Sequence, residues 1–369
     1  MDTRVARARY PYCRGAYASR TPERPNGCRL TLHVGLIGVG RIGAFHAETL
    51  RALPGVSRLT IADADTGRAR DVARELGVAA AETPEALFGQ APDAVVIAAP
   101  TPAHTPLLAL AAAAGVPAFC EKPVALELGA LEGVLAEVER AGILVQVGFQ
   151  RRFDRGYRAA RDAVAGGTLG RLLVLRAATH DPAPPPEEYI AHSGGIFRDL
   201  HIHDFDAVRF VTGDEVVEVY ADGAVLETPW FATHGDVDAA AAVLKLAGGA
   251  LAVVTGTRHD PLGYDVRLEV FGVGDSIAVG LDARSPIRSV EPGARPVESG
   301  YRNFVDRFAA AYRDELAAFT DAVAEGRPSP CTLADAHAAL RIALAADRSR
   351  AERRPVAIDE VPRPKGAEG

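Results

Sequence analysis

Residues 31–43 read Thr-Leu-His-Val-Gly-Leu-Ile-Gly-Val-Gly-Arg-Ile-Gly, and this stretch decides the fold. The apolar run that ends at Ile37 predicts a buried strand, and a helical pattern begins inside the glycine-rich turn that follows it. Gly38 permits the tight turn, Gly40 lets the backbone approach a pyrophosphate, and Gly43 lets helix and strand pack closely. The positive end of the helix dipole would face the phosphates. We therefore predict that the whole turn binds a dinucleotide, through Gly38, Val39, Gly40, Arg41, Ile42 and Gly43.

A carboxylate follows the second predicted strand, which covers residues 58–62. This residue, Asp63, lies 20 positions after Gly43, where an acid that binds the adenosine ribose diol is expected. Because its charge would repel a 2′-phosphate, NAD is favoured over NADP, although Arg68 and Arg70 lie nearby and keep NADP as an alternative. A packing turn without a ligand is the other interpretation of the glycines, and the acid at this spacing argues against it.

Strands and helices then alternate. Buried strands are predicted at 93–99, 116–120 and 143–147, with helices at 106–114 and 128–141. This alternation is typical of an α/β fold with a doubly wound parallel sheet, a Rossmann arrangement. Ligands of such sheets bind at the carboxyl ends of the strands. Further contacts to the cofactor are therefore expected from the polar residues at those ends, Thr101, His104, Glu121, Lys122 and Gln150.

Lys122 is the most unusual of these residues. The chain has 41 basic residues, and only those at 122, 245 and 365 are lysine. Arginine stays protonated in proteins, whereas a partly buried lysine can titrate. A solvated loop lysine is the alternative, but the position of Lys122 at the carboxyl edge of the sheet favours an active-site role.

The second half begins with arginines at 151, 152, 155, 158 and 161 in a helix-like stretch, and a loop is predicted over 179–186. A helix is predicted from about 196 to 211. It would place Asp199 and His203 four residues apart on one face, where a carboxylate can orient the imidazole, and Asp206 would border that face. A helix cap at Asp199 with a structural His203 is the alternative. His201 and His203 would point apart on a helix, so we predict no metal site.

The remaining segments predict an open, mainly antiparallel sheet, from the alternating stretches 216–220, 239–246, 250–257 and 267–271. Its free face is suited to contact with a second subunit. Long helices are predicted at 301–324 and 333–348. Tyr264 is either a substrate contact or a packed hairpin tyrosine.

The predicted organisation is a nucleotide-binding domain over 31–148 and a substrate-binding and oligomerisation domain over 149–361, with a disordered extension (1–30) and tail (362–369).

Composition narrows the class of protein. The chain has 369 residues, 48% of them hydrophobic, and a formal net charge of −7, which argues against nucleic acid as a partner. No apolar run approaches the ~20 residues that span a membrane. The four cysteines form no CxxC pair, so neither zinc nor a disulfide framework is expected, and the cytoplasm is the default location. Residues 1–30 lack the apolar core of a secretory signal, and a transit peptide is the alternative there.

Three motifs together resemble the Gfo/Idh/MocA oxidoreductase family: the glycine pattern at 38–43, Glu121-Lys122-Pro123, and Asp199-x-x-x-His203. Within that family, the stretches 146–154, 181–186 and 193–206 resemble inositol 2-dehydrogenases, as does Tyr264 in Gly-Tyr-Asp. The resemblance covers residues 32–353. Residues 1–30 have no counterpart in it.

The resemblance implies a catalytic triad of Lys122, Asp199 and His203. It also implies substrate contacts from Lys122, Arg151, Asp181, Asp206 and Tyr264. The implied reaction is NAD-dependent oxidation of an inositol, first of all myo-inositol at C2, to an inosose in a homodimer or homotetramer. Alternatives are another sugar or polyol, the reverse reduction of a keto-inositol, a non-catalytic NAD-dependent sugar sensor, or NAD-dependent glycoside cleavage.

Overall fold

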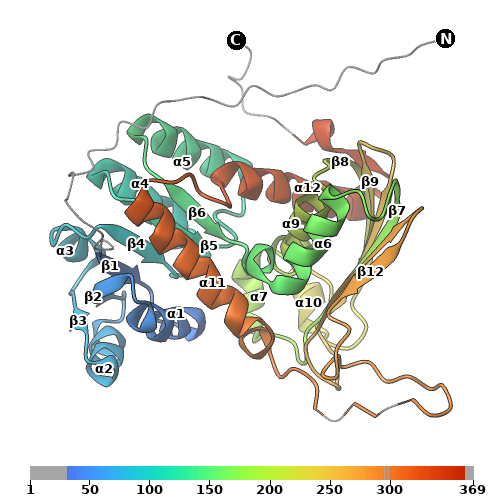
Figure 1. Ribbon diagram of the computed structural model, residues 1–369, viewed down its shortest axis with the longest axis horizontal. Helices are drawn as coiled ribbons and strands as arrows, with labels where there is room; N and C mark the ends of the chain where they lie inside the picture. The colour runs from blue at the N-terminus through green and yellow to red at the C-terminus, as the bar shows by residue number, and fades with distance from the viewer. Residues whose placement is uncertain (1–30, 295, 298, 362–369) are drawn as a thin grey trace.

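A computed structural model describes residues 31–294, 296–297 and 299–361 (Figure 1). The extension expected at 1–30 and the tail expected at 362–369 lie outside the described residues, as do Cys13 and Cys28. Cys120 and Cys331 are buried free thiols. None of the described helices is long and apolar enough to cross a membrane.

The first sheet contains β1 (Leu32–Ile37), β2 (Val56–Ala62), β3 (Ala79–Ala80), β4 (Ala94–Ile97), β5 (Ala118–Glu121) and β6 (Val145–Gly148). Its strand order is β3-β2-β1-β4-β5-β6, and every neighbouring pair is parallel. The predicted doubly wound sheet is confirmed. Strand order reverses between β1 and β4, which is where such sheets bind ligands.

Helices cover this sheet because its strands are apolar on both faces: β4, β5 and β6 are buried throughout. The helical segments are α1 (Arg41–Ala52), α2 (Thr66–Leu76), α3 (Pro84–Phe88), η1 (Thr101–Ala103), α4 (His104–Ala114) and α5 (Leu128–Ala141). The helices α4 and α5 end at Gly115 and Gly142, whose positive φ angles of 67° and 64° close each helix without steric cost.

The second sheet contains β7 (Leu172–His180), β8 (Val216–Ala224), β9 (Ala239–Leu246), β10 (Leu251–Thr257), β11 (Asp265–Gly272), β12 (Ser276–Val279) and β13 (Val356–Ala357). Its order is β12-β11-β7-β10-β9-β8-β13. Only β7 and β10 run parallel, so the predicted mainly antiparallel sheet is confirmed.

One boundary was wrong. Thr179 and His180 were expected in a loop, but they continue β7, where they pair with Gly256 and Thr257 of β10.

One face of the second sheet is covered and the other is open. The helices α6 (Arg155–Ala165), α9 (Ile202–Thr212) and α12 (Leu333–Glu352) lie on the covered side (Figure 1). Burial alternates along β9, with Ala242 and Leu244 buried and Val243 exposed, as expected for a sheet with one solvated face.

The remaining helical segments are η2 (Gln150–Phe153), α7 (Glu187–Ser193), α8 (Ile196–Asp199), α10 (Trp230–Thr233), α11 (Phe304–Glu325) and η3 (Ile358–Glu360). Of these, α11 returns to the first sheet, where Leu316 and Phe319 join the core formed with β1. The long helices predicted near 301–324 and 333–348 are confirmed as α11 and α12.

The helix predicted over 196–211 is interrupted, which corrects the idea that Asp199 and His203 share one helical face. Helix α8 ends at Asp199, and α9 begins at Ile202. The intervening His201 is fully buried, and its Nδ1 lies 2.9 Å from Oδ2 of Asp204. This side-chain contact holds the connecting turn between the two helices.

Candidate active site

The glycine-rich turn at the end of β1 has the shape that a dinucleotide requires. A Cβ on Gly43 would lie 2.0 Å from the carbonyl oxygen of Gly38, so only glycine allows α1 to lie this close to β1. At Gly40, by contrast, a Cβ would meet nothing within 4 Å, which leaves space beside the backbone. Gly40 also caps α1 without any side-chain hydrogen bond, so N–H groups of the first turn remain available to a phosphate.

Asp63 lies at the carboxyl end of β2, directly beside this turn. Its carboxylate accepts hydrogen bonds from the N–H groups of Val39 (2.7 Å) and Asp65 (2.8 Å) and from Nη2 of Arg68 (2.7 Å). Burial raises the pKa of Asp63, but the Arg68 guanidinium and the backbone donors outweigh it and hold this pKa below its usual value. The buried, ionised acid and the open space at Gly40 together fit an NAD molecule.

The other predicted cofactor contacts fall into two groups. Thr101 and Gln150 lie at the carboxyl ends of β4 and β6, as expected. His104 is buried, with Nδ1 2.8 Å from the carbonyl oxygen of Pro123 and Nε2 2.7 Å from that of Ala99. The ring therefore connects the loops that follow β4 and β5, and its contact with a cofactor stays a prediction.

Glu121 is also buried, at the end of β5. Its Oε1 lies 2.7 Å from Nε2 of His46 on α1, and its Oε2 accepts from the N–H of Lys122 at 3.2 Å. These contacts connect α1 to the backbone of Lys122. A direct contact between Glu121 and the cofactor likewise stays a prediction.

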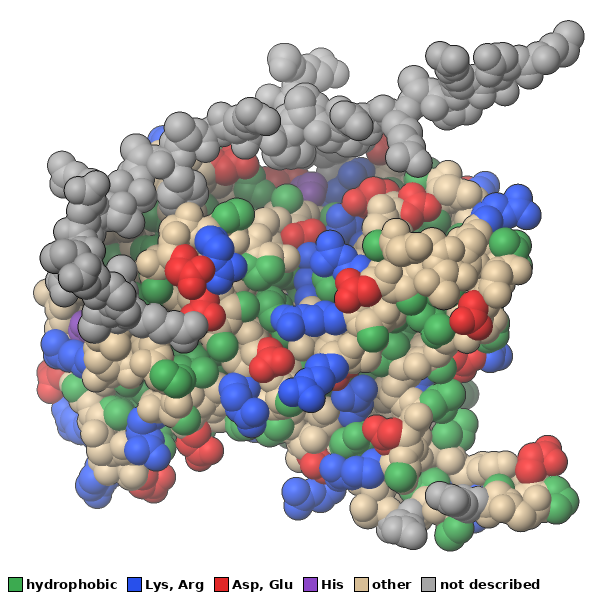
Figure 2. Space-filling view, viewed as in Figure 1, with side chains coloured by type: hydrophobic (Ala, Val, Ile, Leu, Met, Phe, Trp, Pro, Cys, Tyr) green, Lys and Arg blue, Asp and Glu red, His purple; other side chains and the backbone are tan. Residues whose placement is uncertain are grey.

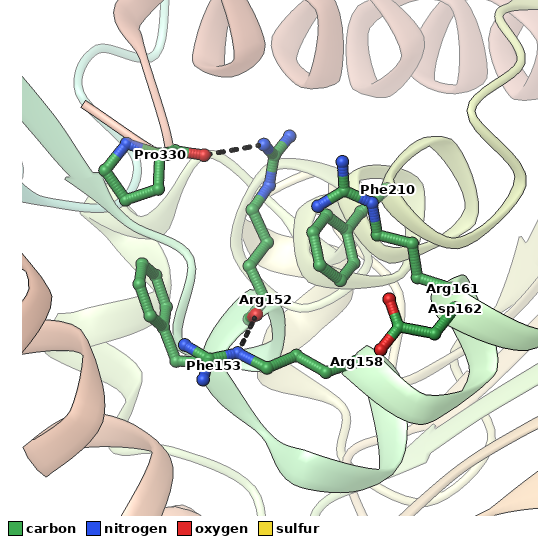
Figure 3. A pocket seen from close by; sticks show the side chains of 7 residues that line it. All are labelled: Arg152, Phe153, Arg158, Arg161, Asp162, Phe210 and Pro330. Carbon is green, nitrogen blue, oxygen red and sulfur yellow. Dashed lines mark hydrogen bonds between the residues drawn. The ribbon is translucent and has the colours of Figure 1, made fainter. Parts of the chain in front are cut away.

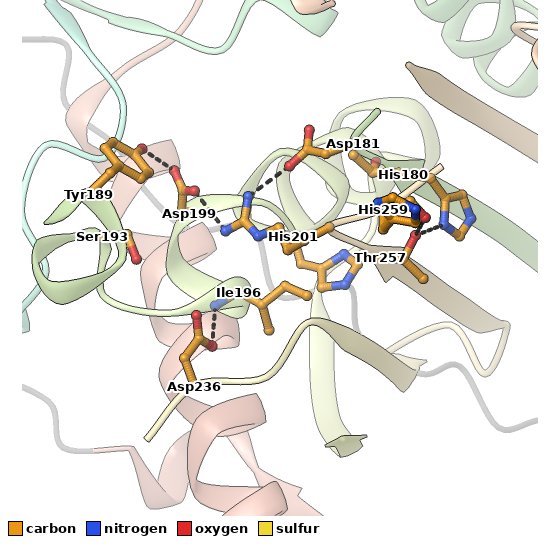
Figure 4. A network of polar contacts seen from close by, with 12 residues as sticks. His180, Asp181, Tyr189, Ser193, Ile196, Asp199, His201, Asp236, Thr257 and His259 are labelled. Carbon is orange, nitrogen blue, oxygen red and sulfur yellow. Dashed lines mark hydrogen bonds and ion pairs between the residues drawn. The ribbon is translucent and has the colours of Figure 1, made fainter. Parts of the chain in front are cut away.

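Lys122 and Asp199 meet between the two sheets. The Lys122 ammonium donates to the carbonyl oxygen of Asp199 at 2.9 Å and to its Oδ1 at 3.2 Å. The Tyr189 hydroxyl, from α7, donates to the same Oδ1 at 2.8 Å, and Figure 4 shows the two side chains facing each other. Although half of Tyr189 is exposed, its hydroxyl end points into the site. Lys122 thus reaches across 77 residues of sequence to a carboxylate that Tyr189 also contacts from the neighbouring helix α7.

Arg258 completes this network and was missed from the sequence. Its guanidinium donates to Oδ2 of Asp199 at 2.8 Å and to Oδ2 of Asp181 at 2.9 Å, and it is buried. The parallel register explains the second contact. His180 of β7 pairs with Thr257 of β10, so the next residue of each strand, Asp181 and Arg258, emerges at the same edge.

No sequence motif marked Arg258 as a site residue, because the sequence does not show that β7 pairs with β10.

These contacts determine the charge of Asp199. Burial alone would raise its pKa, but Lys122 and Arg258 lower it far below its usual value, and the Tyr189 hydroxyl helps. Asp199 therefore stays ionised throughout the neutral range. The same carboxylate, together with burial, raises the pKa of Tyr189, so the tyrosine stays protonated and donates. The pKa of Asp181 is raised by its burial, which Arg258 only partly offsets.

His203 lies nearby but has a different environment. Its ring packs edge-to-face against Phe149 at a centroid distance of 6.0 Å, and its Nδ1 is buried without a hydrogen-bond partner among the described residues. Burial, followed by the charges of Lys122 and Arg151, lowers its pKa well below the usual value. The ring is therefore neutral near pH 7 and able to accept a proton.

Asp199 does not hold the His203 ring as expected. Among the described residues no hydrogen bond joins the two side chains, because Asp199 is occupied by Lys122, Tyr189 and Arg258. The break between α8 and α9 also removes the regular one-turn spacing that was expected to bring the two side chains together. The influence of Asp199 on His203 is electrostatic, since its charge opposes the lowering of the histidine pKa.

Arg151 belongs to a second buried network. Its Nη1 lies 2.5 Å from Oδ1 of Asp204, and its Nη2 donates to the Thr179 hydroxyl at 2.9 Å. Asp204 also contacts His201, so Arg151 is joined to the turn between α8 and α9. Tyr264 is buried close by, and its pKa is raised by burial with Arg151 opposing the shift. Substrate contacts from Arg151 and Tyr264 stay predictions.

Asp206 belongs to a third group of buried side chains, together with Arg152. Both of its oxygens accept from Arg152, at 2.8 and 2.6 Å, and it is almost fully buried. Its contact with a substrate hydroxyl, expected from the sequence, stays a prediction. The structure thus brings Lys122, Asp199 and Asp181 into one network and separates Asp206 from it. Within the described residues, no three His, Cys, Asp or Glu side chains are grouped so as to bind a metal ion.

The arrangement suits proton removal beside a dinucleotide. A neutral imidazole, an ammonium group and a carboxylate held ionised lie near one another. The ammonium, that of Lys122, follows β5 at the same edge of the first sheet as the turn that fits a pyrophosphate. An oxygen that loses its proton to His203 would be stabilised by the Lys122 ammonium.

Comparison with known proteins agrees with this geometry. Residues 32–149 match the model of the oxidoreductase family with an NAD-binding Rossmann fold, and residues 157–278 match the Gfo/Idh/MocA C-terminal domain. Myo-inositol 2-dehydrogenase of Thermotoga maritima is 38% identical over 89% of this chain and 99% of its own length. A myo-inositol dehydrogenase of Streptomyces leeuwenhoekii is 42% identical over 86% of this chain and 96% of its own length.

A solved structure shows the same architecture. The crystal structure of scyllo-inositol dehydrogenase from Lactobacillus casei with bound NAD(H) and scyllo-inositol has a TM-score of 0.81 and 27% identity, and the match covers 89% of this chain and 99% of that one. The chain therefore belongs to the Gfo/Idh/MocA family and is an NAD-binding oxidoreductase that acts on CH–OH groups.

Proposed function

We propose that this protein oxidises an inositol, with myo-inositol at C2 as the first candidate, to an inosose, and reduces one NAD per turnover. The main supporting observation is the Lys122–Asp199 pair, with the neutral His203 nearby. Lys122 directly follows β5, at the same edge of the first sheet as the dinucleotide turn after β1. The names of the two bacterial relatives support an inositol as substrate. When bound, NAD supplies the hydride acceptor.

The roles of the side chains follow from their charges. His203 accepts the hydroxyl proton of the substrate, because its lowered pKa keeps the ring neutral. Lys122 donates a hydrogen bond to the same oxygen and stabilises its developing negative charge. Asp199, ionised and held by Arg258 and Tyr189, positions the Lys122 ammonium. The carbinol carbon loses a hydride, the oxygen loses a proton, and a ketone forms.

A second inositol isomer is the alternative substrate. The scyllo-inositol bound in the Lactobacillus casei structure favours it. The proposed compartment is the cytoplasm, since Cys120 and Cys331 are free thiols.

A substrate panel tests the proposal directly. NADH formation at 340 nm is measured with myo-, scyllo- and D-chiro-inositol and D-glucose, each with NAD and with NADP. We expect the highest kcat/KM with myo-inositol and NAD. A protein that binds NADH but oxidises none of these polyols would contradict inositol oxidation and favour another sugar substrate or a sensor.

The Lys122→Arg variant tests whether the reaction needs a compact ammonium group at this position. The guanidinium is larger and would neither fit the space beside Asp199 nor place a single donor at the reacting oxygen. We expect turnover to fall by at least about 100-fold, while NADH affinity, followed by fluorescence, stays within about twofold. Turnover close to that of the wild type would remove Lys122 from the mechanism.

The Arg258→Met variant tests whether Arg258 keeps the carboxylate of Asp199 ionised. Arg258 lowers the pKa of Asp199 and Asp181, so its loss lets both pKa values rise. The Asp199 carboxylate, no longer paired with Arg258, also raises the pKa of His203, whose protonation stops it acting as a base. Both effects move the acidic limb of the kcat/KM–pH profile to higher pH.

Arg258→Lys, which keeps the charge, should reverse part of this shift. Arg307→Met is a matched control, since Arg307 is a partly buried arginine that pairs with Asp154 instead. A lower kcat with an unmoved pH profile in Arg258→Met would show that Arg258 only supports the fold.

We also propose that a second copy of the chain covers the open face of the second sheet, in a homodimer or homotetramer. Tyr220, Val243 and Leu251 are exposed there, by 43%, 40% and 41%. Adjacent strands place Tyr220 opposite Val243, and Val243 opposite Val253, so the apolar side chains form a continuous row. Arg176 and Glu269, which form an ion pair, continue this row across β7 and β11.

Val243→Asp would place a charge in the middle of this row without touching the core. We expect the molar mass from light scattering to fall toward that of one chain, 38.8 kDa for 369 residues. Val273→Asp, at the exposed turn between β11 and β12, is the control and should leave the mass unchanged. An assembly that withstands Val243→Asp would place the interface elsewhere.

A further inference from the structure

A cleft of about 210 Å³ lies apart from the network of Lys122 and Asp199, with which it shares no lining residue. Its walls come from η2, α6, α9 and the segment before α12 (Figure 3). The lining residues are Arg152, Phe153, Arg158, Arg161, Asp162, Phe210 and Pro330. Three of these are arginines from the basic stretch that the proposed reaction leaves unused.

Two of the arginines are held in place by aromatic rings and have no acidic partner. Arg158 lies over the ring of Phe153 at 5.3 Å, and Arg161 lies over that of Phe210 at 4.7 Å. Neither forms an ion pair with any described residue, and the Nε of Arg158 donates to the carbonyl oxygen of Arg152 at 3.2 Å. Stacking orients a guanidinium plane while its N–H edges remain free to bind an anion.

Arg152 forms the buried wall of the cleft. It is only 9% exposed, and its Nε and Nη2 are occupied by Asp206. Its Nη1, however, makes only a 3.5 Å contact with the carbonyl oxygen of Pro330. A buried guanidinium edge with so little hydrogen bonding favours a further acceptor at this position.

The acids near the cleft gather around Arg152 and Arg209. Asp206 pairs with Arg152, Glu215 pairs with Arg209, and Asp335 lies 3.0 and 3.7 Å from nitrogens of the two arginines. In the lining, Arg158 and Arg161 therefore face a single acid, Asp162.

We propose that this cleft binds a small anion that carries a phosphate group. Guanidinium edges match phosphate oxygens with paired hydrogen bonds, and three arginines from η2 and α6 line this cleft. The volume suits phosphate itself or a phosphate monoester of a short polyol and is smaller than the usual range for drug-sized ligands, roughly 300–1,000 Å³. The dinucleotide has its own phosphate site at the glycine-rich turn, so the cleft would serve a second ligand.

The test is calorimetric titration of the full-length protein with inorganic phosphate and with glycerol 3-phosphate. Saturating NADH keeps both probes away from the glycine-rich turn, and sodium chloride keeps the ionic strength constant. We expect saturable binding of at least one probe. Tighter binding of glycerol 3-phosphate would identify a phosphate ester as the ligand, and equal affinities would identify phosphate alone.

Substitutions of residues on α6 should change the affinity for the anion in opposite directions. Arg158→Ala and Arg161→Ala should each raise the Kd about tenfold, the usual effect of losing one charged hydrogen bond. Asp162→Asn removes the opposing acid and should lower the Kd. Arg155→Ala is the matched control, because Arg155 is exposed on the same helix but does not line the cleft.

The proposal is overturned by either of two outcomes. One is the absence of saturable binding at constant ionic strength. The other is an equal loss of affinity in Arg155→Ala and Arg161→Ala, which would mean attraction to the general charge of the helix. Unchanged thermal unfolding of each variant confirms that the fold is intact.

Discussion

A single buried carboxylate, that of Asp199, ties the two sheets of this protein together. Lys122 reaches it from the end of β5, Arg258 from the end of β10, and Tyr189 from α7. Each donor belongs to a different part of the chain, so the carboxylate can be satisfied only when both sheets and α7 are in place. The geometry of the active site therefore depends on the completed fold.

This arrangement defines the site more than it stabilises the protein. Removing charged groups from water is costly, and a buried ion pair is often no more stable than apolar residues of the same shape. Breaking one partner away, however, typically costs about 3–5 kcal/mol, because it leaves an uncompensated charge. Asp199 thus holds its neighbours in one geometry, and it lies beside a histidine whose own burial keeps it neutral.

Other buried arginines are also each paired with an acid of their own. Arg151 is committed to Asp204 and Thr179, whereas Arg152, its neighbour in sequence, is committed to Asp206 and faces the outer cleft. Two adjacent arginines therefore pair with different acids of α9. Their identical chemistry in the sequence conceals this difference, which arises because each guanidinium turns toward the nearest buried acid.

The sequence by itself determined the features that rest on local patterns. Glycine spacing, apolar periodicity and strand–helix alternation predicted the parallel sheet, the nucleotide turn, Asp63 and the edge position of Lys122, because each depends on residues close together in the chain. Only the tertiary structure decided the partners of Asp199, the break before α9 and the role of Arg258. Those depend on which strands become neighbours: the parallel pairing of β7 with β10 places Arg258 beside Asp181, across 77 residues of sequence.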